Sequence, residues 1–240
     1  MKKHFFLYFI LFNFVTQNLH AKEFFYEVYG LNFRFMEIQF SNNSDSKITA
    51  NIVSKGLLDL FVSFKGGGST EINKEITSYK FNYKKKKKGR ATTIIFKDRE
   101  VIQNYSQPPR KNKTNLVPIQ KHHLKNVLDP LTAINDILFS QKNELNCTKK
   151  IKVFDGSDVF YLILSQQDTK DYIVKSSKIV LKQPLKKCRL RYQAVAGHEI
   201  EDEKDYNKKY VDIFYGKQNG IYLPYLLQTK SKITIKMFLK

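Results

Sequence analysis

The chain has 240 residues and a formal charge of +20, from 42 basic and 22 acidic residues. Only six of the basic residues are arginine, the residue that contacts phosphate and guanine in a bidentate manner, so the composition argues against nucleic-acid binding. Hydrophobic residues make up 42% of the chain, which is enough for a folded core and argues against a long disordered tail.

Residues 1–21 are typical of an export signal. Lys2 and Lys3 provide a positive start, residues 5–15 form a mostly apolar run, and Ala21 is a small residue at a suitable cleavage position. The run is shorter than the roughly 20 apolar residues that cross a bilayer, which favours a cleaved signal over an uncleaved anchor. We therefore predict a periplasmic protein that does not span the membrane, with one β-rich domain at residues 22–240.

The first half of that domain has the patterns of β-strands. Residues 23–29 and 32–40 form an opening pair, and alternation along the second places Met36, Ile38 and Phe40 on the inner face. Further strands are predicted at residues 47–54, 69–76, 79–85, 91–97 and 100–106. The apolar segment 57–64 is consistent with either a buried strand or two turns of helix, and we expect the glycines at 66–68 to end it.

A run of basic residues falls between two of these strands, so we expect it at a hairpin. It consists of Lys84, Lys85, Lys86, Lys87, Lys88 and Arg90. Charge at such a position deters pairing between sheet edges, and solvation alone would explain it. The alternative is contact with an anionic component of the cell envelope, such as lipid head groups or acidic polysaccharide.

The second half contains the clearest helix. Residues 107–126, with three prolines, read as a surface connection, and residues 128–139 then form a helix with Asp129 as its cap and Pro130 in its first turn. Leu131, Ile134 and Leu138 recur at helical spacing and should pack on the sheet.

Strands follow the helix, and 197–208 is predicted to be a charged loop. The expected strands are 149–154, 159–166, 172–174, 178–182, 187–195, 209–215, 221–228 and 232–239, the first two joined at an Asp-Gly turn. We predict a mainly β fold: a curved antiparallel sheet, open or closed into a partial barrel, that wraps one main helix.

Two cysteines, Cys147 and Cys188, are present in this predicted exported chain. A pair in an oxidising compartment most simply forms a disulfide. No catalytic residue, metal site or cofactor is predicted. His198 and Glu199 begin like the zinc motif HExxH, but Asp202 stands where the second histidine would be.

Several short segments occur in an order that resembles a bacterial family of exported proteins, the domain of unknown function 3108. They are residues 25–29 (FYEVY), 55–59 (KGLLD), 128–133 (LDPLTA), 153–156 (VFDG) and 188–192 (CRLRY), together with Cys147 and the pair Leu223 and Pro224. The resemblance implies a periplasmic, mostly β protein with no established reaction. By looser analogy, such proteins resemble curved-sheet lipoprotein carriers, whose concave face holds acyl chains.

Two functions follow as hypotheses. The first is a non-catalytic envelope protein that binds a lipid or other apolar ligand within the concave sheet. The expected cleft residues are Leu57, Leu58, Leu60, Phe61, Leu131, Ile134 and Leu138. The second is an envelope glycan or ester hydrolase that uses Asp155 or the acids at residues 201–205, and it requires two carboxylates, or a serine and a histidine, to converge in a pocket.

Overall fold

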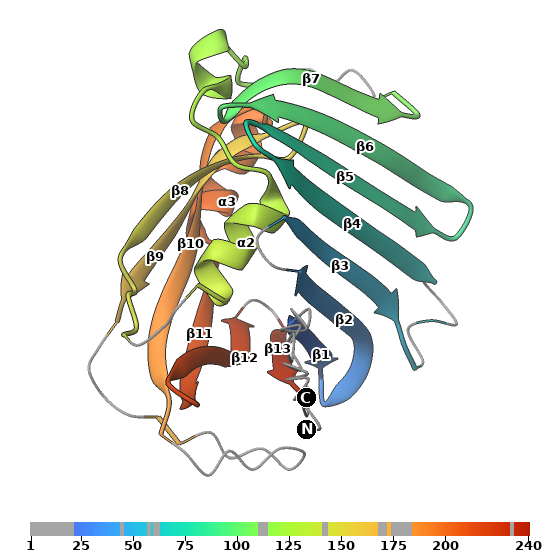
Figure 1. Cartoon of the computed structure of the whole chain (residues 1–240). Coiled ribbons are helices and arrows are strands. Elements are labelled where there is room, and N and C mark those ends of the chain that lie inside the picture. The colour runs from blue at the N-terminus through green and yellow to red at the C-terminus, as the bar shows by residue number, and fades with distance from the viewer. Residues whose placement is uncertain are drawn as a thin grey trace, which may run out of the picture.

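A computed structural model describes residues 22–43, 46–56, 59, 63–109, 115–140, 144–167, 172–173, 184–230 and 233–240. The predicted export signal, most of the apolar segment 57–64 and the strand expected at 178–182 lie outside these ranges. In the described residues, thirteen strands form one antiparallel sheet (Figure 1). The prediction of a mainly β, antiparallel fold is confirmed.

The sheet consists of two meanders joined at its centre. The first contains β1 (Lys22–Gly30), β2 (Phe33–Asn43), β3 (Lys47–Ser54), β4 (Phe64–Asn73), β5 (Ile76–Lys85), β6 (Lys88–Lys97) and β7 (Glu100–Gln107). The second contains β8 (Lys149–Phe154), β9 (Val159–Gln166), β10 (Lys186–Ala196), β11 (Tyr210–Gln218), β12 (Ile221–Lys230) and β13 (Thr234–Leu239). The strand order is β7-β6-β5-β4-β3-β2-β1-β13-β12-β11-β10-β9-β8, so β1 and β13 pair in the middle.

Tight turns explain why neighbours in the sequence pair in the sheet. The turns between β1 and β2, β6 and β7, and β11 and β12 each contain two residues with positive φ, a conformation whose twist matches that of the flanking strands. Asn219 and Gly220 suit this conformation well, whereas Leu31 in the first turn adopts it at an energetic cost.

The sheet curves around the helix but does not close into a barrel. Its two edges are β7 and β8, and no pairing joins them in the described chain. The segment before the helix lies between these edges: the amide of Val127 donates to the carbonyl of Arg99, and Leu128 exchanges hydrogen bonds with the backbone of β8. The open form of the predicted sheet is therefore the one observed (Figure 1).

The main helix, α2 (Pro130–Leu138), lies within the curve and contacts β3, β4 and β8 (Figure 1). Asp129 caps it and Pro130 occupies its first position, as predicted. Just beyond it, the ring of Phe139 stacks on Phe24 and Phe40, with ring centroids 4.1 and 4.7 Å apart respectively. These contacts join the end of the helix to β1 and β2, near the centre of the whole sheet.

Two local predictions were wrong. The glycines at 66–68 do not end a segment but lie inside β4, because a Cβ at these positions would crowd atoms of the sheet and, at Gly68, would also contact Leu131 of the helix. The expected loop at 197–208 contains a 3₁₀ turn, η2 (Ile200–Asp202), and a short helix, α3 (Glu203–Lys208). Acidic residues in the first turn of α3 and Lys208 in its last turn suit the helix dipole.

The connection predicted at 107–126 also contains local structure in its described part. It includes a 3₁₀ turn, η1 (Lys121–Leu124), and a bridge from Leu116 to Glu199. Of the strand expected at 172–174, Tyr172 forms only an isolated bridge with Leu185.

Candidate functional site

A cavity of about 580 Å³ lies between α2 and the concave face of the sheet. The helix side is formed by Pro130, Leu131, Ile134, Ile137, Leu138 and Phe139. The first meander contributes Tyr26, Ile38, Phe40, Ala50, Ile52, Tyr79, Phe81, Tyr83, Arg90 and Thr92, and the second contributes Asp155, Ser157, Phe160, Leu190, Val211, Leu227 and Met237. Apolar and aromatic side chains therefore make up most of the wall.

The interior face of β4 helps to explain why this space is not filled. Strand register places Gly68 opposite Ala50 and Gly66 opposite Ile52, so these two positions on β4 add no side chain to the inner face. A Cβ at Gly68 would lie 2.9 Å from the carbonyl oxygen of Lys80 and 3.4 Å from Leu131 of the helix. The glycines thus allow the sheet to bend close to α2 and leave room beside the helix.

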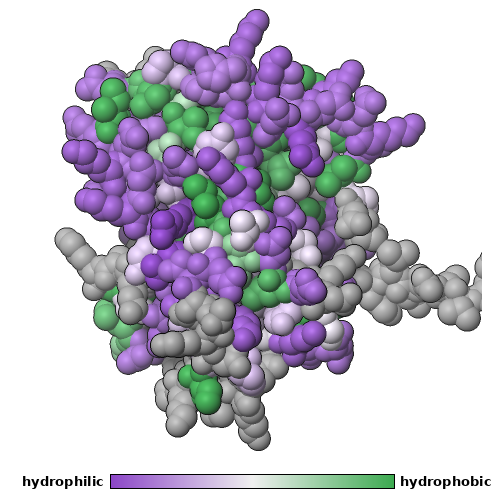
Figure 2. All heavy atoms as spheres, turned by 90° about the vertical axis from the view of Figure 1, so that its left-hand side faces the viewer, coloured by the Kyte–Doolittle hydropathy of each residue, from purple (hydrophilic) through white to green (hydrophobic). Residues whose placement is uncertain are grey.

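The outer surface contrasts with this interior. On the side that faces the viewer in Figure 2, hydrophilic residues cover most of the surface and hydrophobic residues are scattered among them. On the strands of the second meander, the ammonium group of Lys150 lies over the ring of Tyr161, and Arg189 pairs with Asp212 at 2.7 Å. In this region the apolar side chains are therefore concentrated on the concave side of the sheet.

Three of the seven residues expected to form a cleft border this cavity. Leu131, Ile134 and Leu138 all lie on its helix side. The other four, Leu57, Leu58, Leu60 and Phe61, lie outside the described residues. The helix face could be predicted because its apolar residues recur at helical spacing within a short segment. The opposite wall could not, because it depends on which strands the sheet brings together.

Asp129 fixes the start of the helix from within the core. Its carboxylate accepts hydrogen bonds from the amides of Leu131 and Thr132 at 3.0 Å, and from the hydroxyl of Thr132 at 2.6 Å. The hydroxyl of Thr70 on β4 donates to the same carboxylate at 2.6 Å. Asp129 and Thr70 are both buried, so this network ties the beginning of α2 directly to the first meander.

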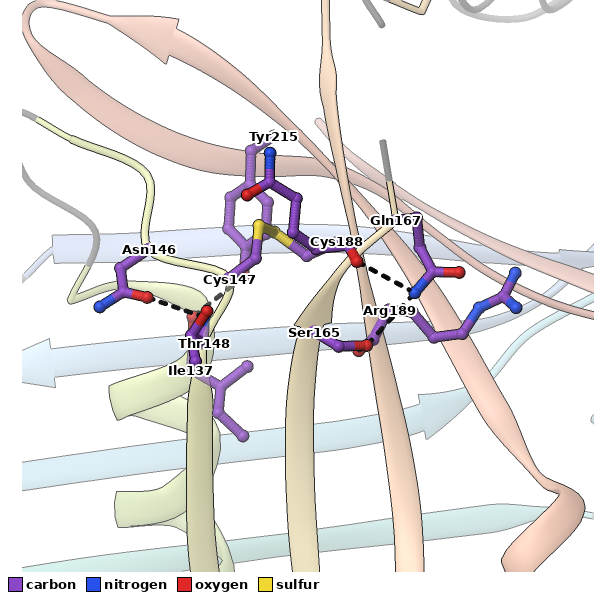
Figure 3. The surroundings of a disulfide bond; sticks show 10 residues. Ile137, Asn146, Cys147, Thr148, Ser165, Gln167, Cys188, Arg189 and Tyr215 are labelled. Atoms are coloured by element: carbon purple, nitrogen blue, oxygen red, sulfur yellow. Dashed lines mark hydrogen bonds between the residues drawn. A yellow bond between two sulfur atoms is a disulfide. The ribbon is translucent and has the colours of Figure 1, made fainter. Parts of the chain in front are cut away.

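The predicted disulfide is confirmed, and it packs in one cluster with Ile137 and Leu138 at the other end of the helix. Cys147 and Cys188 are bonded, with Cα atoms 5.5 Å apart, and the bridge lies near Ile137 and Tyr215 (Figure 3). The hydroxyl of Tyr215 donates to the carbonyl of Ile137 at 2.9 Å. Burial raises the pKa of Tyr215 well above its ordinary value. The helix is thus attached to the second meander as well.

Most polar groups of the wall have partners within the protein. Tyr26 donates to the carbonyl of Pro224 at 3.1 Å, and burial, followed by the nearby Tyr215, raises its pKa. The hydroxyl of Thr92 lies 3.1 Å from that of Ser106. Asp155 accepts from the amides of Ser157 and Asp158 in the turn between β8 and β9. Arg90 differs: its Nε is buried and has no hydrogen-bond partner.

The basic run lies partly on the surface of the protein and partly at the wall of the cavity. Lys84, Lys85, Lys86, Lys87 and Lys88 are exposed at the end of the β5–β6 hairpin, which projects at the right of Figure 1. Arg90, two residues into β6, is half-buried and borders the cavity. Sequence reasoning grouped Arg90 with the surface lysines. Alternation with the apolar residue Ile94 of the same strand was the signal that could have placed it inside.

The acids considered for a hydrolase do not meet at this cavity. Asp155 is the one carboxylate among the described residues that border it. Glu201 lies in η2, Glu203 and Asp205 lie on α3, and all three are exposed. Within the described ranges there is no group of three or more His, Cys, Asp or Glu side chains that could hold a metal ion.

Comparison with known proteins finds a similarity of fold. No family model matches the sequence, and no curated protein matches it either. The chain is similar to a crystal structure described as a β-barrel-like protein of domain of unknown function DUF1849 from Brucella abortus. The TM-score is 0.52 at 12% sequence identity, over 92% of this chain and 95% of that chain. At this identity the likeness shows a shared fold and nothing about activity.

Membrane insertion through a helix has no candidate in the described ranges. No helix there is both long enough and apolar enough to cross a bilayer.

Proposed function

We propose that the protein is exported to the periplasm and binds a lipid or another apolar ligand in the cavity between α2 and the sheet, without catalysing a reaction. The observation that carries this proposal is the cavity itself, which is lined mostly by apolar and aromatic side chains. Its volume of about 580 Å³ falls within the range of roughly 300–1,000 Å³ that is usual for small-molecule sites.

The way in which the helix is held also supports ligand binding. A space of this size would normally be lost by collapse of the core, because unfilled apolar volume is destabilising. Here Asp129 attaches one end of α2 to β4, and the disulfide region attaches the other end to the second meander. A helix held at both ends keeps the space open.

The cellular setting is part of the proposal. The residues at the start of the chain favour export. The proposal includes membership of the family of domain of unknown function 3108 and a support role in the envelope. The fold shared with another domain of unknown function is compatible with that membership. A lipoprotein-carrier-like role is an analogy of architecture, because both place a helix inside a curved sheet. The exposed lysines at 84–88 would then contact anionic envelope components.

The first test is recovery of a natural ligand. The protein is purified from the periplasm of its host with the disulfide intact and extracted with organic solvent, and the extract is analysed by mass spectrometry. We expect a lipid or another apolar compound that is absent from a parallel extract of an unrelated periplasmic protein. Recovery only in the cytoplasm, with residues 1–21 still attached, would contradict export.

The second test fills the cavity. Binding of the neutral fluorescent probe N-phenyl-1-naphthylamine is measured for the protein and for Ile134→Trp, which places a larger side chain in the space beside α2. Ala50→Leu fills it from β3 and serves if the helix variant does not fold. Ile102→Trp, at an exposed position on β7, is the matched control.

We expect both cavity variants to weaken probe binding by about tenfold or more, the equivalent of roughly 1.4 kcal/mol, while the control binds as the original protein does. Equal binding by all forms would show that the probe does not occupy this cavity and would refute the proposal.

A further inference from the structure

Arg90 is a cationic side chain at the wall of a mostly apolar cavity. It lies on the inner face of β6, opposite Tyr83 of β5, and both residues border the space. Its Nε atom is buried and makes no hydrogen bond, and Arg90 forms no ion pair with the residues that the structure describes. A buried donor without an acceptor is destabilising, so this arrangement needs a reason other than folding.

From this geometry we propose that Arg90 holds the carboxylate of a long-chain carboxylic acid whose hydrocarbon chain occupies the cavity. This inference rests on the proposed function and names the class of ligand. A guanidinium group presents several N–H donors in a plane, and this matches the two oxygens of a carboxylate. A neutral oxygen also accepts hydrogen bonds from a guanidinium group, but only an anion neutralises its charge.

The other polar groups of the wall do not offer an equivalent anchor. The hydroxyl of Tyr26 is bonded to a backbone carbonyl, and that of Thr92 lies within hydrogen-bond distance of Ser106. The carboxylate of Asp155 accepts two amide hydrogen bonds within its own turn and does not pair with Arg90. Arg90 is therefore the group on this wall that is best placed to receive an anion.

The surrounding charge favours the same class of ligand. Lys85 and Lys88 face each other across the hairpin beside Arg90, and both are exposed. Lys84 lies at the same end of β5, and Lys86 and Lys87 form the turn between the two strands. Positive potential at this end attracts anions from solution and discourages cationic amphiphiles.

The experiment compares two ligands that differ only in the head group. Laurate and 1-dodecanol are each used to displace N-phenyl-1-naphthylamine from the protein, at low salt and at a pH where laurate is ionised. The measurement is repeated with Arg90→Gln, which removes the charge, and with Lys87→Gln, which removes one charge from the exposed part of the same hairpin. Arg90→Lys keeps the charge but loses the planar group.

We expect Arg90→Gln to weaken laurate binding by about tenfold or more, because a hydrogen bond between charged groups is lost, and to leave dodecanol binding within about twofold. Lys87→Gln should change laurate binding by less than about twofold, since an exposed charge is screened. Arg90→Lys should give an intermediate value for laurate. Arg90→Met provides the same comparison if the glutamine variant does not fold.

The outcomes separate this inference from the function on which it rests. If both ligands displace the probe and Arg90→Gln affects them equally, Arg90 does not hold the carboxylate, although ligand binding in the cavity stands. If neither ligand displaces the probe and Ile134→Trp leaves probe binding unchanged, both proposals are overturned. An equal effect of Lys87→Gln and Arg90→Gln on laurate would assign the preference to the general surface charge and overturn the role of Arg90.

Discussion

Replacement of Asp129 by alanine should destabilise the protein far more than loss of the half-buried carboxylate of Asp136 from the same helix. The change removes the acceptor for the amides of Leu131 and Thr132, which is a helix cap worth about 1 kcal/mol. It also leaves the buried hydroxyl of Thr70 without its partner, at a further cost of roughly 1–3 kcal/mol. Together the two effects predict a loss of about 3 kcal/mol in the free energy of unfolding.

Urea unfolding followed by circular dichroism measures this loss. Asp136→Ala is the matched control, because Asp136 lies on the same helix but is only half-buried and pairs with Lys149 at 2.8 Å. Such a surface pair contributes up to about 1 kcal/mol. Asp129→Ala should also weaken binding of N-phenyl-1-naphthylamine, since the helix that borders the cavity loses its attachment to β4.

A double-mutant cycle tests the reasoning at its most specific point. Thr70→Val should cost about 1 kcal/mol less in the Asp129→Ala background than in the original protein, because the hydroxyl that it removes has already lost its acceptor. If Thr70→Val has the same cost in both backgrounds, the hydrogen bond between the two side chains does not contribute as described. If Asp129→Ala costs no more than Asp136→Ala, the argument from burial is wrong as a whole.

Two further predictions concern the bridge and the buried tyrosines. Cys147→Ala combined with Cys188→Ala opens a loop with a separation of 41 residues and should lower the free energy of unfolding by about 4 kcal/mol; a change below about 1 kcal/mol in urea unfolding would refute this. Burial raises the pKa of Tyr26, Tyr192 and Tyr215 in the folded protein, so their contribution to stability is fully present below pH 10.0 and is lost as the pH rises above it. Phenolate absorbance should therefore rise in full only on unfolding, and ionisation of all tyrosines near pH 10.0 in the folded state would contradict it.

The elements that the sequence predicted well are those set by neighbouring residues. Asp129 followed by Pro130 marks the start of α2, because capping and a fixed φ act within one turn. The hairpin of β8 and β9 turns at residues 155–158, where Asp155 accepts hydrogen bonds from the amides of Ser157 and Asp158. The disulfide was predicted from two cysteines and from the expectation that the chain is exported to an oxidising compartment.

The parts that depend on distant residues were less accessible. Gly66 and Gly68 look like a break in the sequence, and only the folded chain places them inside β4, with Gly68 beside Leu131 of the helix. The segment 203–208 was too polar and too short to stand out as a helix, and Tyr206 packs against Tyr192 of β10 in the folded chain. The cavity likewise requires the two meanders to be placed around α2, which no local pattern encodes.

The central pairing of β1 with β13 has a consequence for how the chain reaches its folded form. Within each meander most strands pair with the next strand in sequence, so both can assemble through short-range contacts, which form quickly. The seam between them joins Tyr26 to Leu239 and cannot form until nearly the whole described chain is present. Until then β1 and β13 each present an unpaired edge, which makes the half-assembled protein the form most prone to aggregate.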